Sequence, residues 1–117
     1  MLIRIDPSAE EPLFSQIADA LRQQVAAGAL GVGTKLPPAK LLAEQLGVNL
    51  HTVLRAYQEL RDEGLVELRR GRGATITAQA NGVEALVDDV DALLAKGQQL
   101  GVSLESLVAL LQVRADC

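Results

Sequence analysis

Apolar residues recur every three or four positions along much of the chain, a spacing that places them on one face of a helix. The first such face is formed by Leu13, Ile17, Leu21 and Val25. Pro12 precedes this face and Gly28 follows it. Because proline suits the start of a helix and glycine suits its end, we expect a helix between these two residues.

Two shorter helices are predicted next, separated by a tight turn at Gly47. Pro37-Pro38 opens the first helix, and its expected buried residues are Leu41, Leu42 and Leu46. Asn49 is a suitable N-cap for the second helix, which should end at Gly64. The expected inner face of this second helix consists of Val53, Ala56, Tyr57 and Leu60.

A β-hairpin is predicted after the second of these helices. Residues 65–68 and 74–77 have the composition of two short strands, and Gly71-Arg72-Gly73 would form the tip between them. The alternating residues 2–5 predict one further short strand at the N-terminus. The order of helix, turn, helix and wing predicts a mainly α fold with a small β-hairpin, namely a winged helix-turn-helix with a C-terminal helical appendage.

The last third of the chain has a helical pattern of its own. Residues 77–82 are small or polar and predict a joint, after which apolar residues recur at spacings of three and four. Residues 97–101, with a glycine at each end, predict a break. Ser103 is then a suitable N-cap for a final helix. The pattern therefore predicts a region of two helices after the hairpin.

The composition narrows the classes of function. The chain has 117 residues, and its aromatic residues are Phe14 and Tyr57. Proteins that bind single-stranded nucleic acid need aromatic platforms for the bases, so this class is disfavoured. The N-terminus lacks a signal-peptide pattern, no apolar run approaches the ~20 residues of a membrane span, and Cys117 is the only cysteine. We expect a cytoplasmic protein without a membrane partner.

The charged residues are unevenly distributed, although the net charge is only −4. Acidic residues predominate after the predicted hairpin, at Glu84, Asp88, Asp89, Asp91, Glu105 and Asp116. Basic residues gather in the middle of the chain, at Lys35, Lys40, Arg55, Arg61, Arg69, Arg70 and Arg72. Polar residues at a helix start and arginines on a hairpin tip are the means by which a small protein grips duplex DNA. The middle of the chain is therefore expected to face DNA.

The ordered motifs of this region resemble the GntR family of bacterial transcription regulators. The resemblance rests on Pro12-Leu13-Phe14-x-Gln16-Ile17, Gly28, Gly33-x-x-Leu36-Pro37, Leu42-Ala43-x-x-Leu46-Gly47-Val48, Thr52-Val53, Ala56-Tyr57, Leu60, Gly64-Leu65-Val66 and Gly71-Arg72-Gly73. It covers roughly residues 10–77, and the two-helix remainder is similar to the YtrA subfamily. The resemblance implies a winged helix-turn-helix DNA-binding domain over residues 1–78 and a two-helix dimerisation region over residues 79–117.

The chain departs from the family pattern at two places. The family usually has Ser-x-Arg where this chain has Pro38-Ala39-Lys40, and it often has Ser-Arg where this chain has Asn49 and Leu50. A lysine reaches a phosphate as a point charge, without the bidentate fork of an arginine. We therefore expect residues 50–52 to give this protein an unusual sequence preference.

The candidate DNA contacts fall on the second short helix and on the wing. The start of a recognition helix enters the major groove, so Leu50, His51 and Thr52 are expected to meet base edges. The arginines of the hairpin tip are expected to enter a minor groove. For Asn49 we expect helix capping first, and Gly73 can serve turn geometry alone. The predicted DNA-binding residues are Lys35, Lys40, Asn49, Leu50, His51, Thr52, Arg55, Arg69, Arg70, Arg72 and Gly73.

For several other residues we prefer a structural explanation. Tyr57 is expected in the core with its hydroxyl bonded nearby, and Arg61 can simply pair with neighbouring acids. The acids at 88–91 fit a solvated helix face better than a metal site, and His51 has no second His or Cys beside it in the sequence. Since no acid–base pair, nucleophile or phosphate-cradling loop stands out, we predict no enzyme activity, no metal and no cofactor.

The predicted function is that of a sequence-specific DNA-binding transcription regulator, a repressor that binds a palindromic operator as a homodimer. The alternative is a winged helix used only as a protein-interaction module, and the arginines of the wing favour the first. Two short helices cannot enclose the ~300 Å³ of a typical ligand pocket, so any effector is expected at the dimer interface or between tail and winged helix. The tail has more apolar surface than its two helices can bury, which predicts a twofold contact. The expected dimerisation residues are Val83, Leu86, Val87, Val90, Leu93, Leu94, Leu104, Leu107, Val108 and Leu111.

Overall fold

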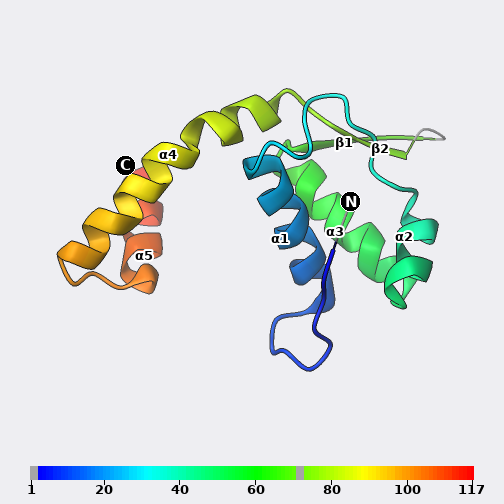
Figure 1. Cartoon of the computed structure of the whole chain (residues 1–117), viewed down its shortest axis with the longest axis horizontal. Coiled ribbons are helices and arrows are strands. Elements are labelled where there is room, and N and C mark those ends of the chain that lie inside the picture. The colour runs from blue at the N-terminus through cyan, green and yellow to red at the C-terminus, as the bar shows by residue number, and fades with distance from the viewer. Residues whose placement is uncertain (1–2, 71–72) are drawn as a thin grey trace. The chain divides into compact units, whose positions relative to one another are not determined.

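The computed structural model describes residues 3–70 and 73–117 and divides the chain into two compact units, residues 1–84 and 85–117. Its elements are α1 (Leu13–Ala26), α2 (Ala39–Leu46), α3 (Leu50–Asp62), β1 (Val66–Arg69), β2 (Gly73–Ile76), α4 (Gln79–Gln99) and α5 (Leu104–Ala115) (Figure 1). Three helices followed by a hairpin and two more helices confirm the predicted fold class, a winged helix-turn-helix with a helical appendage.

The core of the first unit is aliphatic and is organised around α3. This helix lies between α1 and α2 and contacts both of them (Figure 1). Ile17 and Leu21 of α1 and Val53 and Leu60 of α3 have no exposed surface. Their burial follows from the helical spacing of the apolar residues, and each such side chain contributes about 1.5–3 kcal/mol to folding. The predicted inner face of α3 is therefore confirmed.

An ion cluster at the edge of this core ties α1 to α3. Arg22 of α1 donates hydrogen bonds to Glu63, at 2.8 Å, and to Glu59, at 3.3 Å. It also pairs with Asp19 of its own helix at 2.7 Å. The guanidinium is about one-third exposed, so solvent screens the cluster and its contribution to stability is modest. Its effect is to fix how α3 lies against α1.

The buried side of α2 differs from the prediction at one residue. Leu41 was expected in the core, but 45% of its surface is exposed. Leu42 and Ala43 are the buried residues of this helix, and Leu46 packs against the core at its end. At about 100° per residue, Leu42, Ala43 and Leu46 fall on one face of this helix, and Leu41 lies to the side of that face.

The wing is a two-stranded antiparallel sheet in which Val66 pairs with Ile76 and Arg69 pairs with Gly73. Each strand is displaced by one residue from the predicted limits, towards the tip. The outer edge of β2 is covered by residues 33–36, where Lys35 and Thr75 form an isolated bridge. The N–H group of Leu36 donates to the carbonyl of Ala74 at 2.9 Å. This segment covers an edge that would otherwise be open to other chains.

The short strand predicted at residues 2–5 is wrong for residues 3–5, which lie in no strand. Ile3 and Ile5 instead pack against the core as half-buried side chains. Their alternation reflects burial of every second side chain in an extended segment.

The helix α4 starts earlier and ends later than the sequence indicated. The joint predicted at residues 77–82 is reduced to its first two residues, because α4 begins at Gln79. Thr77 closes the wing by donating to the carbonyl of Gly64 at 2.6 Å, and its hydroxyl oxygen accepts from the Gln79 N–H at 3.3 Å. Ala80 is buried and Val83 is half-buried against the core. Packing therefore keeps the first turns of α4 helical.

The break predicted at residues 97–101 begins later than predicted, since α4 continues to Gln99 and the turn follows at residues 100–101. Gly97 is buried, and a Cβ at this position would lie only 2.8 Å from Cδ1 of Leu107. The missing side chain is what allows α5 to pack closely against α4. A glycine costs about 1 kcal/mol of helix propensity, and burial of Leu107 offsets that cost.

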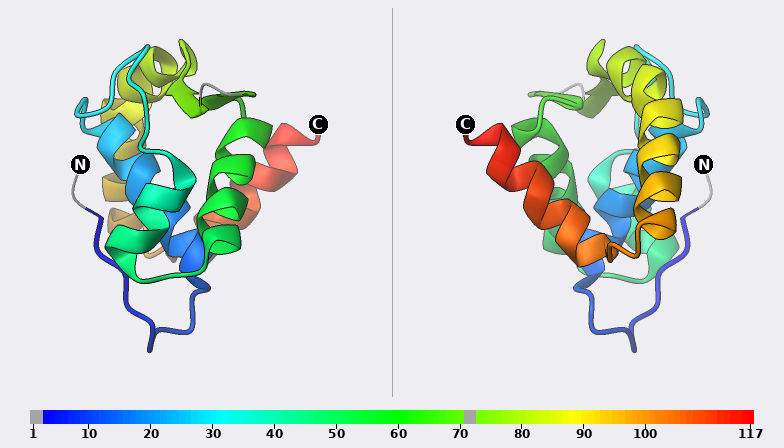
Figure 2. Two further views of the ribbon diagram at one scale, coloured as in Figure 1. Left: turned by 90° about the vertical axis from the view of Figure 1, so that its right-hand side faces the viewer. Right: turned by 90° about the vertical axis from the view of Figure 1, so that its left-hand side faces the viewer.

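The second unit consists of the rest of α4 and of α5. Ser103 caps α5, since its hydroxyl oxygen accepts from the Ser106 N–H at 3.1 Å, as the sequence predicted. Figure 2 shows the two helices meeting at the connecting turn and diverging from it. Leu107 is buried near this turn, but most other large apolar side chains of the unit are exposed. The exposed ones are Leu86, Val90, Leu93, Leu94, Leu100, Val102, Leu104, Val108, Leu110, Leu111 and Val113.

The single tyrosine links α3 to the segment before α2. Tyr57 is buried, and its hydroxyl donates a hydrogen bond of 2.6 Å to the carbonyl of Pro37. Burial raises its pKa to about 12 from the usual 10.0, because the anion would lose its hydration. The predicted core position and bonded hydroxyl are thus confirmed.

This pKa predicts a loss of stability in alkaline solution. The folded state holds the Tyr57 proton more tightly than the unfolded state, so the stabilisation is complete below about pH 10 and disappears as the pH rises towards 12. Urea unfolding at pH 8 and pH 11 should show a larger drop in unfolding free energy for the wild type than for Tyr57→Phe, which cannot ionise. Parallel losses in the two proteins would contradict this assignment.

Candidate nucleic-acid interface

The start of α3 carries a cap and two exposed side chains. Asn49 precedes the helix, and its side-chain oxygen accepts from the backbone N–H of His51 at 2.8 Å. The expected capping role is confirmed. Leu50 and His51 are exposed, whereas Thr52 is half-buried. The first turn of α3 therefore presents one apolar and one imidazole side chain to solvent, with a hydroxyl beside them.

Leu50 is unusual because it is apolar and yet 40% exposed as the first residue of α3. Leucines of α3 that face the core, such as Leu60, are fully buried. An apolar side chain at this position can offer a base only van der Waals contact, for instance to a thymine methyl. The geometry thus keeps Leu50 among the candidates for base contact.

The predicted cations outside the wing, Lys35, Lys40 and Arg55, are exposed. Lys40 is the second residue of α2, and Lys35 lies on the segment that borders β2. Arg55 lies one turn into α3, and its guanidinium carbon is 3.8 Å from the centre of the Phe14 ring of α1. This contact is not predictable from local sequence patterns, because 41 positions separate the two residues.

The wing carries its cations at the end of β1. Arg69 and Arg70 are both exposed, and Nε of Arg69 donates to the Glu67 carboxylate at 2.8 Å. Gly73 begins β2 with φ of +75°, and a Cβ there would meet no atom within 4 Å, so turn geometry accounts for this glycine. The predicted contact Arg72, like Gly71, lies outside the described residues.

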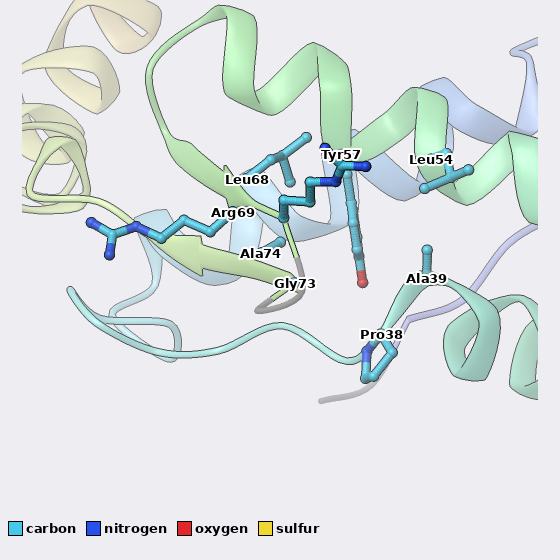
Figure 3. Close-up of a pocket in the computed structure, with 9 residues that line it drawn as sticks. Pro38, Ala39, Leu54, Tyr57, Leu68, Arg69, Gly73 and Ala74 are labelled. Carbon is cyan, nitrogen blue, oxygen red and sulfur yellow. The ribbon is translucent and has the colours of Figure 1, made fainter.

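A depression of about 370 Å³ lies between the start of α2, the outer side of α3 and the wing. In Figure 3 Tyr57 extends from α3 towards Pro38, with Leu54 and Ala39 to one side and the strand residues to the other. Leu54 and Leu68 are half-buried on this surface, and neither is among the residues predicted to contact DNA. The depression is lined by Pro38, Ala39, Leu54, Tyr57, Leu68, Arg69, Arg70, Gly73 and Ala74. The helices α2 and α3 and the wing, which carry predicted DNA contacts, therefore border one surface.

Within residues 3–70 and 73–117, no group of three or more His, Cys, Asp or Glu residues is arranged to hold a metal ion. None of the helices described combines the length and apolar character needed to cross a membrane. Arg61 pairs with its neighbour Asp62 at 3.1 Å, as the sequence suggested.

The fold and its exposed basic elements define a winged helix-turn-helix of the type found in DNA-binding regulators. The family model described as bacterial regulatory proteins, gntR family, matches residues 13–76. The HTH-type transcriptional repressor YtrA of Bacillus subtilis is 32% identical over 112 residues, which cover 91% of this chain and 86% of that protein. The chain belongs to the GntR family.

Two solved structures extend this comparison. One is YtrA from Sulfolobus acidocaldarius, a GntR-family transcription factor, with 34% identity, a TM-score of 0.62, and coverage of 79% of this chain and 99% of that one. The other is the AraR DNA-binding domain in complex with operator ORX1, with 25% identity, a TM-score of 0.57, and coverage of 64% and 93%. These similarities confirm the predicted resemblance to YtrA-type members of the family.

Proposed function

We propose that the protein is a sequence-specific DNA-binding transcription regulator that represses genes from a palindromic operator, and that it acts in the cytoplasm. The observation that carries this proposal is the shared border of α2, α3 and the wing, where exposed Arg69 and Arg70 lie beside the recognition helix. The operator complex of the related AraR domain supports duplex DNA as the partner, and the name of the Bacillus subtilis relative supports repression.

The contacts divide into two kinds. The exposed cations Lys35, Lys40, Arg55, Arg69 and Arg70 neutralise phosphates, which gives affinity without sequence information. The residues of the first turn of α3, Leu50, His51 and Thr52, face base edges in the major groove. Asn49 holds this turn in place through its cap, and its amide group adds a secondary contact.

Dimerisation through the second unit completes the proposal. The apolar side chains of α4 and α5 form an exposed surface. Burying apolar surface stabilises a protein by roughly 25 cal/mol per Å², so this surface favours association. A twofold contact between two copies buries such a surface on both partners at once, and a symmetric dimer matches a palindromic site. Val83 and Leu107 support this interface indirectly, since the first packs on the winged helix and the second lies between α4 and α5.

The phosphate contacts are tested by the salt dependence of binding. Arg70→Ala should weaken binding to every DNA sequence alike and reduce the slope of log K against log salt by about one. The measurement is fluorescence-anisotropy titration with duplexes from the protein's own promoter region at several salt concentrations. Arg61→Ala is the matched control, because Arg61 lies at the far end of α3 and pairs with Asp62.

The same titration decides between the proposal and its alternative. A wild-type protein that binds these duplexes no better than random DNA, with no dependence on sequence, would support the protein-interaction module instead. A wild type that discriminates between sequences, with an unchanged slope in Arg70→Ala, would remove only Arg70 from the interface.

A further inference from the structure

The contact between Phe14 and Arg55 joins two elements of the proposed DNA-binding unit. Phe14 is the second residue of α1, and its half-buried ring packs on the core. Arg55 is exposed on α3, with its guanidinium carbon 3.8 Å from the ring centre. This distance is well inside the ~6 Å within which a ring face attracts a cation. The recognition helix therefore has one of its arginines held by α1.

An arginine that stacks on a ring keeps its N–H donors available for other partners, whereas an arginine paired with a carboxylate uses them. Arg22, Arg61 and Arg69 direct N–H groups at carboxylate oxygens. A guanidinium that stacks through its flat face keeps its N–H donors in the plane, where they can bond a phosphate. In the described part of the chain, no salt bridge to a carboxylate is found for Arg55. The ring thus restricts the arginine without neutralising its charge.

We propose that Phe14 is a positioning residue for DNA binding, which holds Arg55 in the orientation that meets a phosphate. This inference rests on the proposed function. An arginine side chain in solution samples many rotamers, and ordering it on binding weakens the complex. The ring orders Arg55 before DNA arrives, so α1 contributes to affinity without touching the DNA. The same contact fixes α3 near its start, where the base-reading residues lie.

The experiment is a double-mutant cycle on the full-length protein, with Phe14→Leu, Arg55→Ala and the double variant. Phe14→Leu keeps an apolar side chain against the core and removes the ring. We expect it to weaken binding to a promoter duplex about two- to fivefold, the range of an exposed cation–π contact. Arg55→Ala should weaken binding about tenfold and reduce the salt slope by about one. In the Arg55→Ala background, Phe14→Leu should then have no further effect.

Two controls separate positioning from a general effect on the fold. Phe14→Tyr retains the ring face and should restore wild-type affinity, while Phe14→Leu should keep the wild-type salt slope because the charge of Arg55 remains. Combined with Arg61→Ala in place of Arg55→Ala, Phe14→Leu should keep its full effect, because Arg61 does not contact the ring. Thermal unfolding checks that each variant folds.

The outcomes are distinguishable. If Phe14→Leu weakened DNA binding equally in the presence and absence of Arg55, the positioning role would be overturned and the proposed function would remain. Wild-type affinity in either Phe14→Leu or Arg55→Ala would have the same consequence. A wild type without specific binding would overturn the proposed function itself, and the positioning role with it.

Discussion

Removing residues 85–117 is expected to yield a folded monomer that binds a full palindromic operator about 10²–10⁴-fold more weakly than the intact protein. The expected size follows from the effective concentration that a dimer gives to its second half-site contact. Truncation after Glu84 retains Ala80 and Val83, which pack with the winged helix, so the first unit should keep its fold. Sedimentation velocity and titrations on full-site and half-site duplexes measure the two effects.

The half-site duplex is the control for this truncation. Affinity for a single half-site should be nearly unchanged, because the contact residues all lie before Glu84. A truncated protein that remained dimeric would show that the interface lies in the first unit. A monomer with undiminished affinity for the full operator would show that dimerisation does not contribute to binding.

A finer variant tests the exposed face of α4. Leu86 and Val90 are four residues apart, so they share one helix face, and 57% and 50% of their surfaces are exposed. Leu86→Ser with Val90→Ser should dissociate the dimer as the truncation does. Asp88→Ser with Ala92→Ser changes the opposite face of the same helix and should leave the dimer intact.

The features that depend on residues close together in the chain could be predicted from the sequence. The buried faces of α1 and α3, the caps Asn49 and Ser103, and the basic end of β1 all follow from residues close together in the chain. The resemblance to the GntR family placed the candidate contacts on the same elements that the structure brings around one depression.

The features that the sequence could not predict depend on distant residues. Gly97 lies inside a helix because Leu107 packs on it, and no propensity shows that partner. Residues 3–5 form no strand, and Ile3 and Ile5 pack instead on a core assembled from distant parts of the chain. The contact of Arg55 with Phe14, and that of Arg22 with Glu63, require the packing of α3 on α1.

Leu50→Arg is expected to change which operator the protein prefers. Leu50 is the first residue of α3 and is 40% exposed, so an arginine fits there without entering the core. A guanidinium at the start of a recognition helix can bond O6 and N7 of guanine, whereas leucine offers only apolar contact. The preference at one base pair in each half-site should change by about 1–3 kcal/mol. Titrations on operators varied systematically at each position measure this change.

Leu50→Arg also adds a positive charge, which by itself raises affinity for any DNA sequence. Gln58→Arg is the matched control for this effect of charge. Gln58 is exposed two turns further along α3, so an arginine there adds the same charge away from the helix start. This control should raise affinity for all sequences alike and steepen the salt slope by about one. Leu50→Arg should do so as well, but with a gain concentrated on guanine at one position. If its effect were uniform across sequences, like that of Gln58→Arg, the start of α3 would not read bases.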